Sequence, residues 1–145
     1  MLVYEVLGNP VPWAASKTNG KIHYDPKDKE KQQIIWQLKS QLNHEPLTGP
    51  INFHVTFYMP IPKSASGIRK RQMLNGVIHH ICKPDRSNLL KLIEDCAERA
   101  GIISNDSIIV GGEAKKMYGL IPKTIIRIED INHINHHYAE ENRCL

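Results

Sequence analysis

The side chains best suited to chemistry lie in the second half of the chain. Asp85, Ser87, Asn88 and Lys91 fall within one run of seven residues, and Asp106 follows fifteen residues after Lys91. Carboxylate oxygens can bind a divalent cation, and a lysine can stabilise negative charge on a reacting group. These residue types could therefore form a catalytic site, if the fold brings them together.

Each of these residues also has an ordinary structural explanation. An aspartate directly before a helix, such as Asp85, can serve as its N-cap. Asp106 stands in the sequence Asn-Asp-Ser, which is typical of turns. Lys91 can form a surface ion pair with Asp95, four residues later on the same helix. The residues by themselves leave both interpretations open.

A helix must position this run. The sequence predicts it from about residue 86 or 87 to Ala100, closed by Gly101. Its wheel separates an apolar face from a polar stripe of Asn88, Lys91 and Asp95. The helix spans roughly 20 Å, so Asp85 and Asp106 meet only if the following strand runs back beside it. The apolar face, which must point into the core, consists of Leu89, Ile93, Cys96 and Ala100.

The remaining pattern predicts a single compact α/β (α+β) domain in the order β-α-β-α-β-β, with helices packed on a mixed sheet. Residues 8–12 are expected to take an extended or turn path and residues 16–21 to form a polar loop, and Asp25 is expected to be an N-cap with Pro26 at the first helical position. Residues 63–76 are expected to form a basic surface loop in which a short helix can occur. The predicted elements are strand 2–7, helix 26–43, strand 51–58, the helix described above, and strands 108–118 and 120–128 as an antiparallel pair.

Positive charge is concentrated in the middle of the chain. The whole protein carries +4, whereas residues 63–91 hold seven basic side chains and one acidic one, giving +6. Such a stretch suits a polyanion, because each neutralised phosphate releases condensed counterions. A solvated basic loop is the plain alternative.

Composition narrows the class of protein. No apolar stretch approaches the ~20 residues needed to span a bilayer, and the first residues lack the pattern of a signal peptide. Three widely spaced cysteines without a CxxC pair favour reduced thiols, so we expect a cytoplasmic protein without a membrane partner. We expect one domain over residues 1–130 and a polar tail over 131–145, whose histidines lack the spacing of a zinc site.

The central run resembles a known family. Lys-Pro-Asp-x-x-Asn-Leu-x-Lys over residues 83–91, followed by Asn-Asp-Ser over 105–107, looks like the signature of RusA-family Holliday-junction resolvases. In that family an Asp-x-Asp-Asn-Leu-x-Lys run precedes an Asp-Asp turn. The likeness extends through residues 8–12, 24–26 and 116–118, and so covers most of residues 3–128.

The resemblance implies a Mg²⁺-dependent endonuclease, with Mn²⁺ as a possible substitute, that resolves four-way DNA junctions by paired cuts as a homodimer. It implies metal ligands at Asp85 and Asp106 with help from Ser87, and catalytic roles for Asn88 and Lys91. Basic side chains would bind DNA phosphates with little sequence reading. The DNA-binding candidates are Lys17, Lys21, Arg69, Lys70, Arg71, Lys83, Arg86 and Lys116.

The chain departs from the family pattern at two acidic positions. Ser87 stands in place of the second motif aspartate, and Asn105 in place of the first turn aspartate. Fewer carboxylates weaken a Mg²⁺ site, so an alternative is a homologue that binds junctions or duplexes with weak or no cleavage. A more distant alternative is an unrelated small enzyme that uses Asp85, Lys91 and Asp106; absence of salt-dependent DNA binding would favour it.

Overall fold

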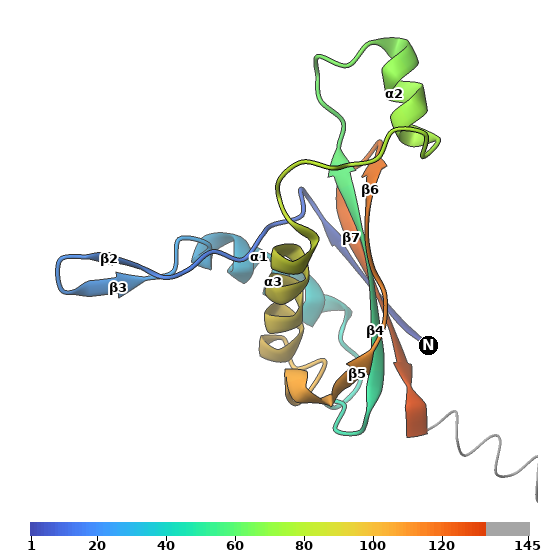
Figure 1. Ribbon diagram of the computed structural model, residues 1–145. Coiled ribbons are helices and arrows are strands. Elements are labelled where there is room, and N and C mark those ends of the chain that lie inside the picture. The colour runs from blue at the N-terminus through green and yellow to red at the C-terminus, as the bar shows by residue number, and fades with distance from the viewer. Residues whose placement is uncertain (133–145) are drawn as a thin grey trace, which may run out of the picture.

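The computed structural model describes residues 1–132, and Figure 1 shows two helices, α1 and α3, on one face of a mixed sheet. The α+β class is therefore confirmed. In chain order the elements are β1 (Leu2–Leu7), β2 (Lys17–Asn19), β3 (Ile22–Tyr24), α1 (Asp28–Gln41), β4 (Ile51–Pro60), α2 (Gly67–Leu74), α3 (Arg86–Arg99), the 3₁₀ helix η1 (Asp106–Ile108), β5 (Ile109–Gly111), β6 (Ala114–Gly119) and β7 (Lys123–Asp130).

Strand β4 is the centre of the five-stranded sheet. It pairs with β7 in antiparallel orientation on one side, and with β5 and β6 in parallel on the other. Strand β1 completes the sheet by pairing antiparallel with β7. The predicted antiparallel pairing of strands 108–118 and 120–128 is therefore wrong, because β4 lies between β6 and β7. A strand that returns through a helical crossover, as β6 does after α3, pairs in parallel with the strand before it.

The single strand expected over 108–118 is broken at Gly112. Its φ is +130°, and a Cβ built there would lie 2.0 Å from the carbonyl oxygen of Phe53. A glycine is required, because the backbone of β4 passes where a side chain would start and the left-handed conformation is costly for other residues. This break separates β5 from β6, while the register shift on β4 lies earlier, between the pairs Ile51–Ile109 and Asn52–Gly111.

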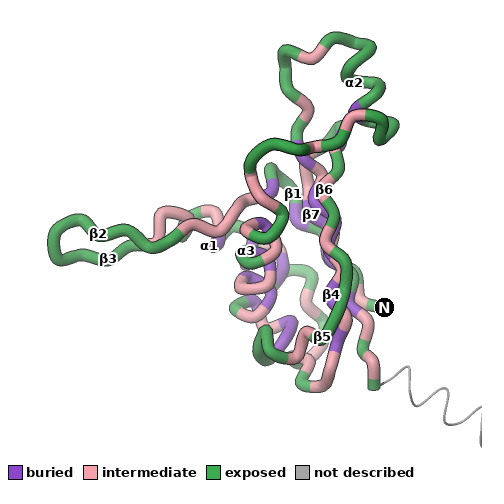
Figure 2. Tube along the Cα trace, in the orientation of Figure 1, coloured by how far each residue is buried: buried purple, intermediate pink, exposed green. Residues whose placement is uncertain are grey.

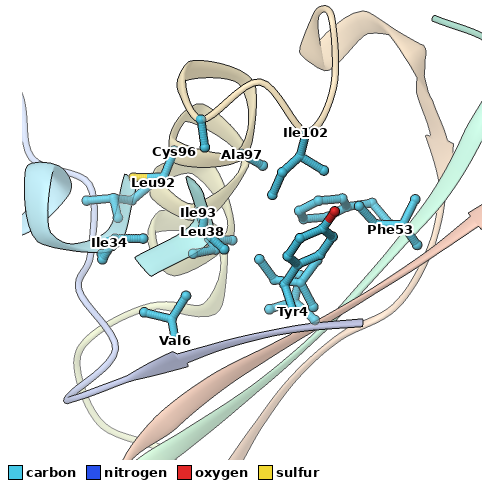
Figure 3. Packing of buried hydrophobic residues seen from close by; sticks show 14 of the residues in the cluster. Tyr4, Val6, Ile34, Leu38, Phe53, Leu92, Ile93, Cys96, Ala97 and Ile102 are labelled. Atoms are coloured by element: carbon cyan, nitrogen blue, oxygen red, sulfur yellow. The ribbon is translucent and has the colours of Figure 1, made fainter. Parts of the chain in front are cut away.

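The core lies between the helices and the inner face of the sheet (Figure 3). The residues predicted to form the apolar face of α3, from Leu89 to Ala100, are all buried. They pack with Ile34 and Leu38 of α1 and with Phe53 and neighbouring side chains of β4. Burial of this apolar surface is the main stabilising contribution, at about 25 cal/mol per Å². It also holds α3 rigidly, so the opposite face of α3 presents its polar side chains in fixed positions.

The segment before α1 differs from the prediction. Residues 16–21 were expected to form a polar loop, but β2 and β3 form an antiparallel two-stranded sheet that projects away from α1 and α3 (Figure 1). Helix α1 begins at Asp28 rather than at Pro26, so Asp25 is not its N-cap residue. The Asp25 carboxylate instead accepts a hydrogen bond from the Lys27 backbone and one from the Lys31 ammonium.

The basic loop between β4 and α3, expected over residues 63–76, contains a helix. Helix α2 begins after Ser66, whose hydroxyl accepts a hydrogen bond from the Arg69 backbone N–H, as an N-cap should. It stands beyond the end of the sheet in Figure 1. None of the helices within residues 1–132 is both long and apolar enough to cross a lipid bilayer. The predicted tail from 131 onward lies almost wholly outside the described residues.

Candidate active site

The candidate site begins on the face of α3 that points away from the core. Ser87, Lys91 and Glu94 follow one another at i, i+4 and i+7, which places them on one stripe of the helix. Ser87 and Lys91 are exposed and Glu94 is half-buried. Asn88 lies at the edge of the stripe. We call Ser87, Asn88, Lys91 and Glu94 the α3 ridge.

Asp85 stands at the N-cap position of α3 but does not cap the helix with its side chain. Its backbone carbonyl accepts the hydrogen bond from Leu89 N–H, and its carboxylate lies 2.9 and 3.0 Å from the Lys83 ammonium. The capping role considered for this aspartate is therefore not what its side chain does. Lys83 is mostly exposed, so its ammonium can exchange a carboxylate partner for a phosphate at little cost.

Lys91 is held by an aromatic ring rather than by the predicted acid. Its ammonium lies 3.6 Å from the centre of the Trp13 ring, a cation–π contact. The Trp13 backbone N–H also donates to the Asn88 carbonyl at 2.9 Å, which fixes the indole beside α3. Asp95 instead pairs with Lys31 and Arg99. The Lys91–Asp95 surface pair is thus absent, and the lysine charge stays free of a carboxylate partner within the described residues.

Asp106 lies beside α3 and close to Glu94. The charge of Asp106, after burial, is a cause of the raised pKa of the Glu94 carboxyl. The turn itself is closed by Asn105, whose side chain accepts from the Ser107 N–H at 2.9 Å. Asn105 therefore takes the turn role that was considered for Asp106. The carboxylate of Asp106, which is exposed, is available for another purpose.

The two motif aspartates are not neighbours along α3. Asp85 precedes its first turn, whereas Asp106 follows its last turn and approaches Glu94, nine residues after Asp85. Nine residues correspond to about 13 Å along a helix axis. The strand that runs back beside α3 brings Lys116, not Asp106, to the start of the helix. A shared metal ion at Asp85 and Asp106 stays a prediction.

The side chains present could bind Mg²⁺ only through a small number of protein ligands. Among residues 1–132, no three histidine, cysteine, aspartate or glutamate side chains gather closely enough to hold a metal ion. Mg²⁺ takes oxygen ligands, keeps several waters and is often bound by one or two carboxylates with a substrate phosphate. Glu94 and Asp106, whose charges influence each other, are two carboxylates that could supply such ligands.

Basic side chains surround the start of α3. The Lys116 ammonium donates to the carbonyls of Cys82 and Pro84, each at 3.0 Å, and Arg86 donates to the Ala114 carbonyl at 3.4 Å. These bonds join the segment before α3, and the first residue of α3, to β6, so both cations also have a structural role. A cavity of about 480 Å³ lies beside them, lined among others by His80, Arg86, Lys116 and Tyr118.

The other DNA-binding candidates are exposed. Arg69, Lys70 and Arg71 lie on α2, and Lys17 and Lys21 lie on the β2–β3 projection. The fold thus places cations on two separate projections, α2 and the β2–β3 hairpin, from segments far apart in the sequence (Figure 1). Whether they contact DNA stays a prediction.

Comparison with known proteins gives this arrangement a family. The family model for Endodeoxyribonuclease RusA matches residues 8–129. The chain belongs to the RusA endodeoxyribonuclease family. It is also similar to the Uncharacterized protein YqaN of Bacillus subtilis (strain 168), with 32% identity over 139 residues, which cover 89% of this chain and 96% of the relative.

The RusA match confirms the resemblance drawn from the central run, and it spans the projection, the α3 ridge and η1. Sequence reasoning missed Glu94. The signal was present in its spacing, because a carboxylate seven residues after Ser87 and three after Lys91 must share their stripe. The sequence could not show that the turn after α3 brings Asp106 close to Glu94.

Proposed function

We propose that this RusA-family chain is a Mg²⁺-dependent endonuclease that acts as a homodimer and resolves four-way DNA junctions by paired cuts. The observation that carries the proposal is the α3 ridge itself. Within the described residues, α3 holds a lysine without a carboxylate partner and a half-buried glutamate on one face, and the turn after the helix brings an exposed aspartate toward that glutamate, in a chain that belongs to an endodeoxyribonuclease family.

The chemical roles follow from these positions. Lys91, whose ammonium lies over the Trp13 ring, would stabilise negative charge that develops on the scissile phosphate. Asn88 would orient a phosphate oxygen by donating from its amide. Asp106, with Glu94 beside it and Asp85 and Ser87 from the resemblance, would supply the metal ligands. Bound Mg²⁺ would polarise the phosphate as a Lewis acid.

DNA binding would be mainly electrostatic. The cations of α2, Lys83 and the β2–β3 projection are exposed, and phosphate contacts of this kind position a duplex without reading its sequence. Two cuts on opposite strands of a junction require two active sites, which a two-fold symmetric dimer supplies. Sedimentation of the free protein tests the dimer directly.

A second candidate is a protein that binds junctions but cuts them weakly or not at all. It is favoured by Ser87 in place of an aspartate and by the distance of Asp85 from Asp106 along α3. It predicts tight junction binding without metal-stimulated nicking, and a gain of nicking in Ser87→Asp.

The deciding experiment measures binding and nicking of one fixed junction by the wild type, Asp85→Asn, Asp106→Asn and Lys91→Ala, with and without Mg²⁺. We expect each variant to bind the junction and to lose most nicking. Loss of one stabilising donor typically costs about 10²–10³ in rate. Lys39→Ala, on the exposed side of α1, is the matched control for Lys91→Ala. Absence of nicking by the folded wild-type dimer in Mg²⁺ and in Mn²⁺ would refute the endonuclease.

A further inference from the structure

The β2–β3 projection, residues 16–24, has no evident structural task. Every residue from 15 to 24 is exposed, and Figure 2 shows the projection green, whereas α1 and α3 also carry purple and pink segments. A two-stranded sheet without a packed face is marginally stable by itself in water. These residues nevertheless form a regular hairpin, which indicates that the hairpin binds a partner outside the subunit. We call it the arm.

The arm is built as a tight hairpin. Asn19 pairs with Ile22, so only Gly20 and Lys21 form the turn. Gly20 has a φ of +66°, and no non-glycine residue has a positive φ in the described chain. A glycine at the first central position is the arrangement of a type II′ turn, which matches the twist of paired strands. Lys21 is thereby held at the tip.

Charge on the arm has one sign. Lys17 and Lys21 are its ionic side chains, and no acidic residue occurs between Glu5 and Asp25. Asp25 does not neutralise the arm, because its carboxylate is bound to Lys31 at 2.5 Å. Two such arms would repel each other through their lysines, so the surface is complementary to a polyanion rather than to its own copy.

Both ends of the arm are fixed to α3. On one side, Trp13 contacts Asn88 through its backbone and Lys91 through its ring. On the other side, Asp25 pairs with Lys31, which also contacts Asp95 at 3.5 Å. The arm therefore extends from the helix that carries the ridge, and a duplex held by the arm would pass close to that ridge.

We infer that the arm inserts into the major groove of a DNA duplex and holds one branch of the substrate across α3. This inference rests on the proposed function. The span from Ser16 to Gly20 is roughly 13 Å at about 3.3 Å per residue, enough to reach the floor of a groove about 8.5 Å deep. The minor groove is only about 6 Å wide, which two strands about 4.8 Å apart would fill before any side chain is counted.

The experiment compares Lys17→Ala/Lys21→Ala with the wild type and with Lys29→Ala/Lys39→Ala, which removes the same charge from α1. Binding of a linear duplex and of a fixed junction is measured in EDTA over a range of salt. Each lost phosphate contact lowers the slope of log affinity against log salt by about 1, so the arm variant should lose about 2. Its melting temperature should match the wild type, because neither lysine contacts the core.

Methylation protection identifies the groove. Guanine N7 lies in the major groove and adenine N3 in the minor groove. At equal saturation, the wild type should protect N7 over a few base pairs and the arm variant should not. An unchanged salt slope, protection at N3 alone, or a change confined to the oligomeric state would overturn the inference. Nicking in Mg²⁺ separates the two proposals. A wild type that nicks junctions, with an arm variant whose salt slope and N7 protection are unchanged, refutes only the arm. Binding that depends on the arm, without nicking by the wild type, refutes only the endonuclease.

Discussion

Lys31 is buried, although lysine is rarely found inside a protein. Its ammonium lies 2.5 Å from Asp25 and 3.5 Å from Asp95, and Arg99 also contacts Asp95 at 3.3 Å. Burial by itself lowers the pKa of Lys31, but the hydrogen bond to Asp25 and the two carboxylate charges outweigh it and the pKa is raised. This group joins the base of the arm, α1 and α3.

Lys31→Met should therefore destabilise the fold strongly. Removing one partner of a buried ion pair costs about 3–5 kcal/mol. The side chains of Asp25 and Asp95 are 24% and 35% exposed, so water partly compensates them. We expect a loss of about 2–3 kcal/mol in the free energy of unfolding, or roughly 5–10 °C in melting temperature. Lys29→Met, exposed on the same helix, should stay within about 0.5 kcal/mol.

Urea unfolding at several pH values checks the cause. The hydrogen bond from Lys31 lowers the pKa of Asp25, so its contribution is complete above the unfolded value of about 3.9 and is lost as pH falls through the folded value. The raised pKa of Lys31 gives a contribution that is complete below about 10.4 and is lost as pH rises through the folded value. The difference between wild type and Lys31→Met should therefore be constant between about pH 4 and 10 and shrink outside it. A loss no larger than that of Lys29→Met would refute the reasoning.

Three further outcomes are expected. Glu94→Gln should raise the melting temperature slightly without metal, because it removes the repulsion from Asp106, and should reduce the stabilisation that Mg²⁺ adds; an unchanged Mg²⁺ shift would exclude Glu94 as a ligand. Gly112→Ala should unfold the protein or lower its melting temperature by more than 10 °C in a thermal scan, since its Cβ would lie 2.0 Å from a backbone oxygen of β4. Alkylation at pH 8 followed by peptide mapping should label Cys82 and spare Cys96, whose pKa burial raises to about 12; early labelling of Cys96 would contradict this.

The parts of the fold that follow local rules could be predicted from the sequence. The apolar period of α3, its end at Gly101 with a φ of +84°, and strands β1 and β4 appear as expected. The error in pairing β6 with β7 arose because adjacent strands are usually paired, whereas which strand becomes central depends on contacts between distant segments. Gly112 gave a local hint of the break, but its partner Phe53 is remote in the sequence.

The candidate site shows the same division. Spacing alone assigned Asn88 and Lys91 to one polar stripe of the helix, together with Asp95. The partner of Lys91 could not be predicted, because Trp13 lies more than seventy residues earlier in the chain and reaches α3 only through the fold. The arm was missed because its strands have only three residues each and none of their side chains enters the core, so that the pattern is too short to mark a strand.

The indole stacked against Lys91 also has an optical consequence. Trp36, the other tryptophan, is 71% exposed on α1, so a change in emission that persists in a Trp36→Phe variant comes from the ring beside the ridge. A phosphate that draws the ammonium away from that ring would alter its fluorescence. The protein thus carries an intrinsic reporter at the point where the sugar-phosphate chain is expected to lie.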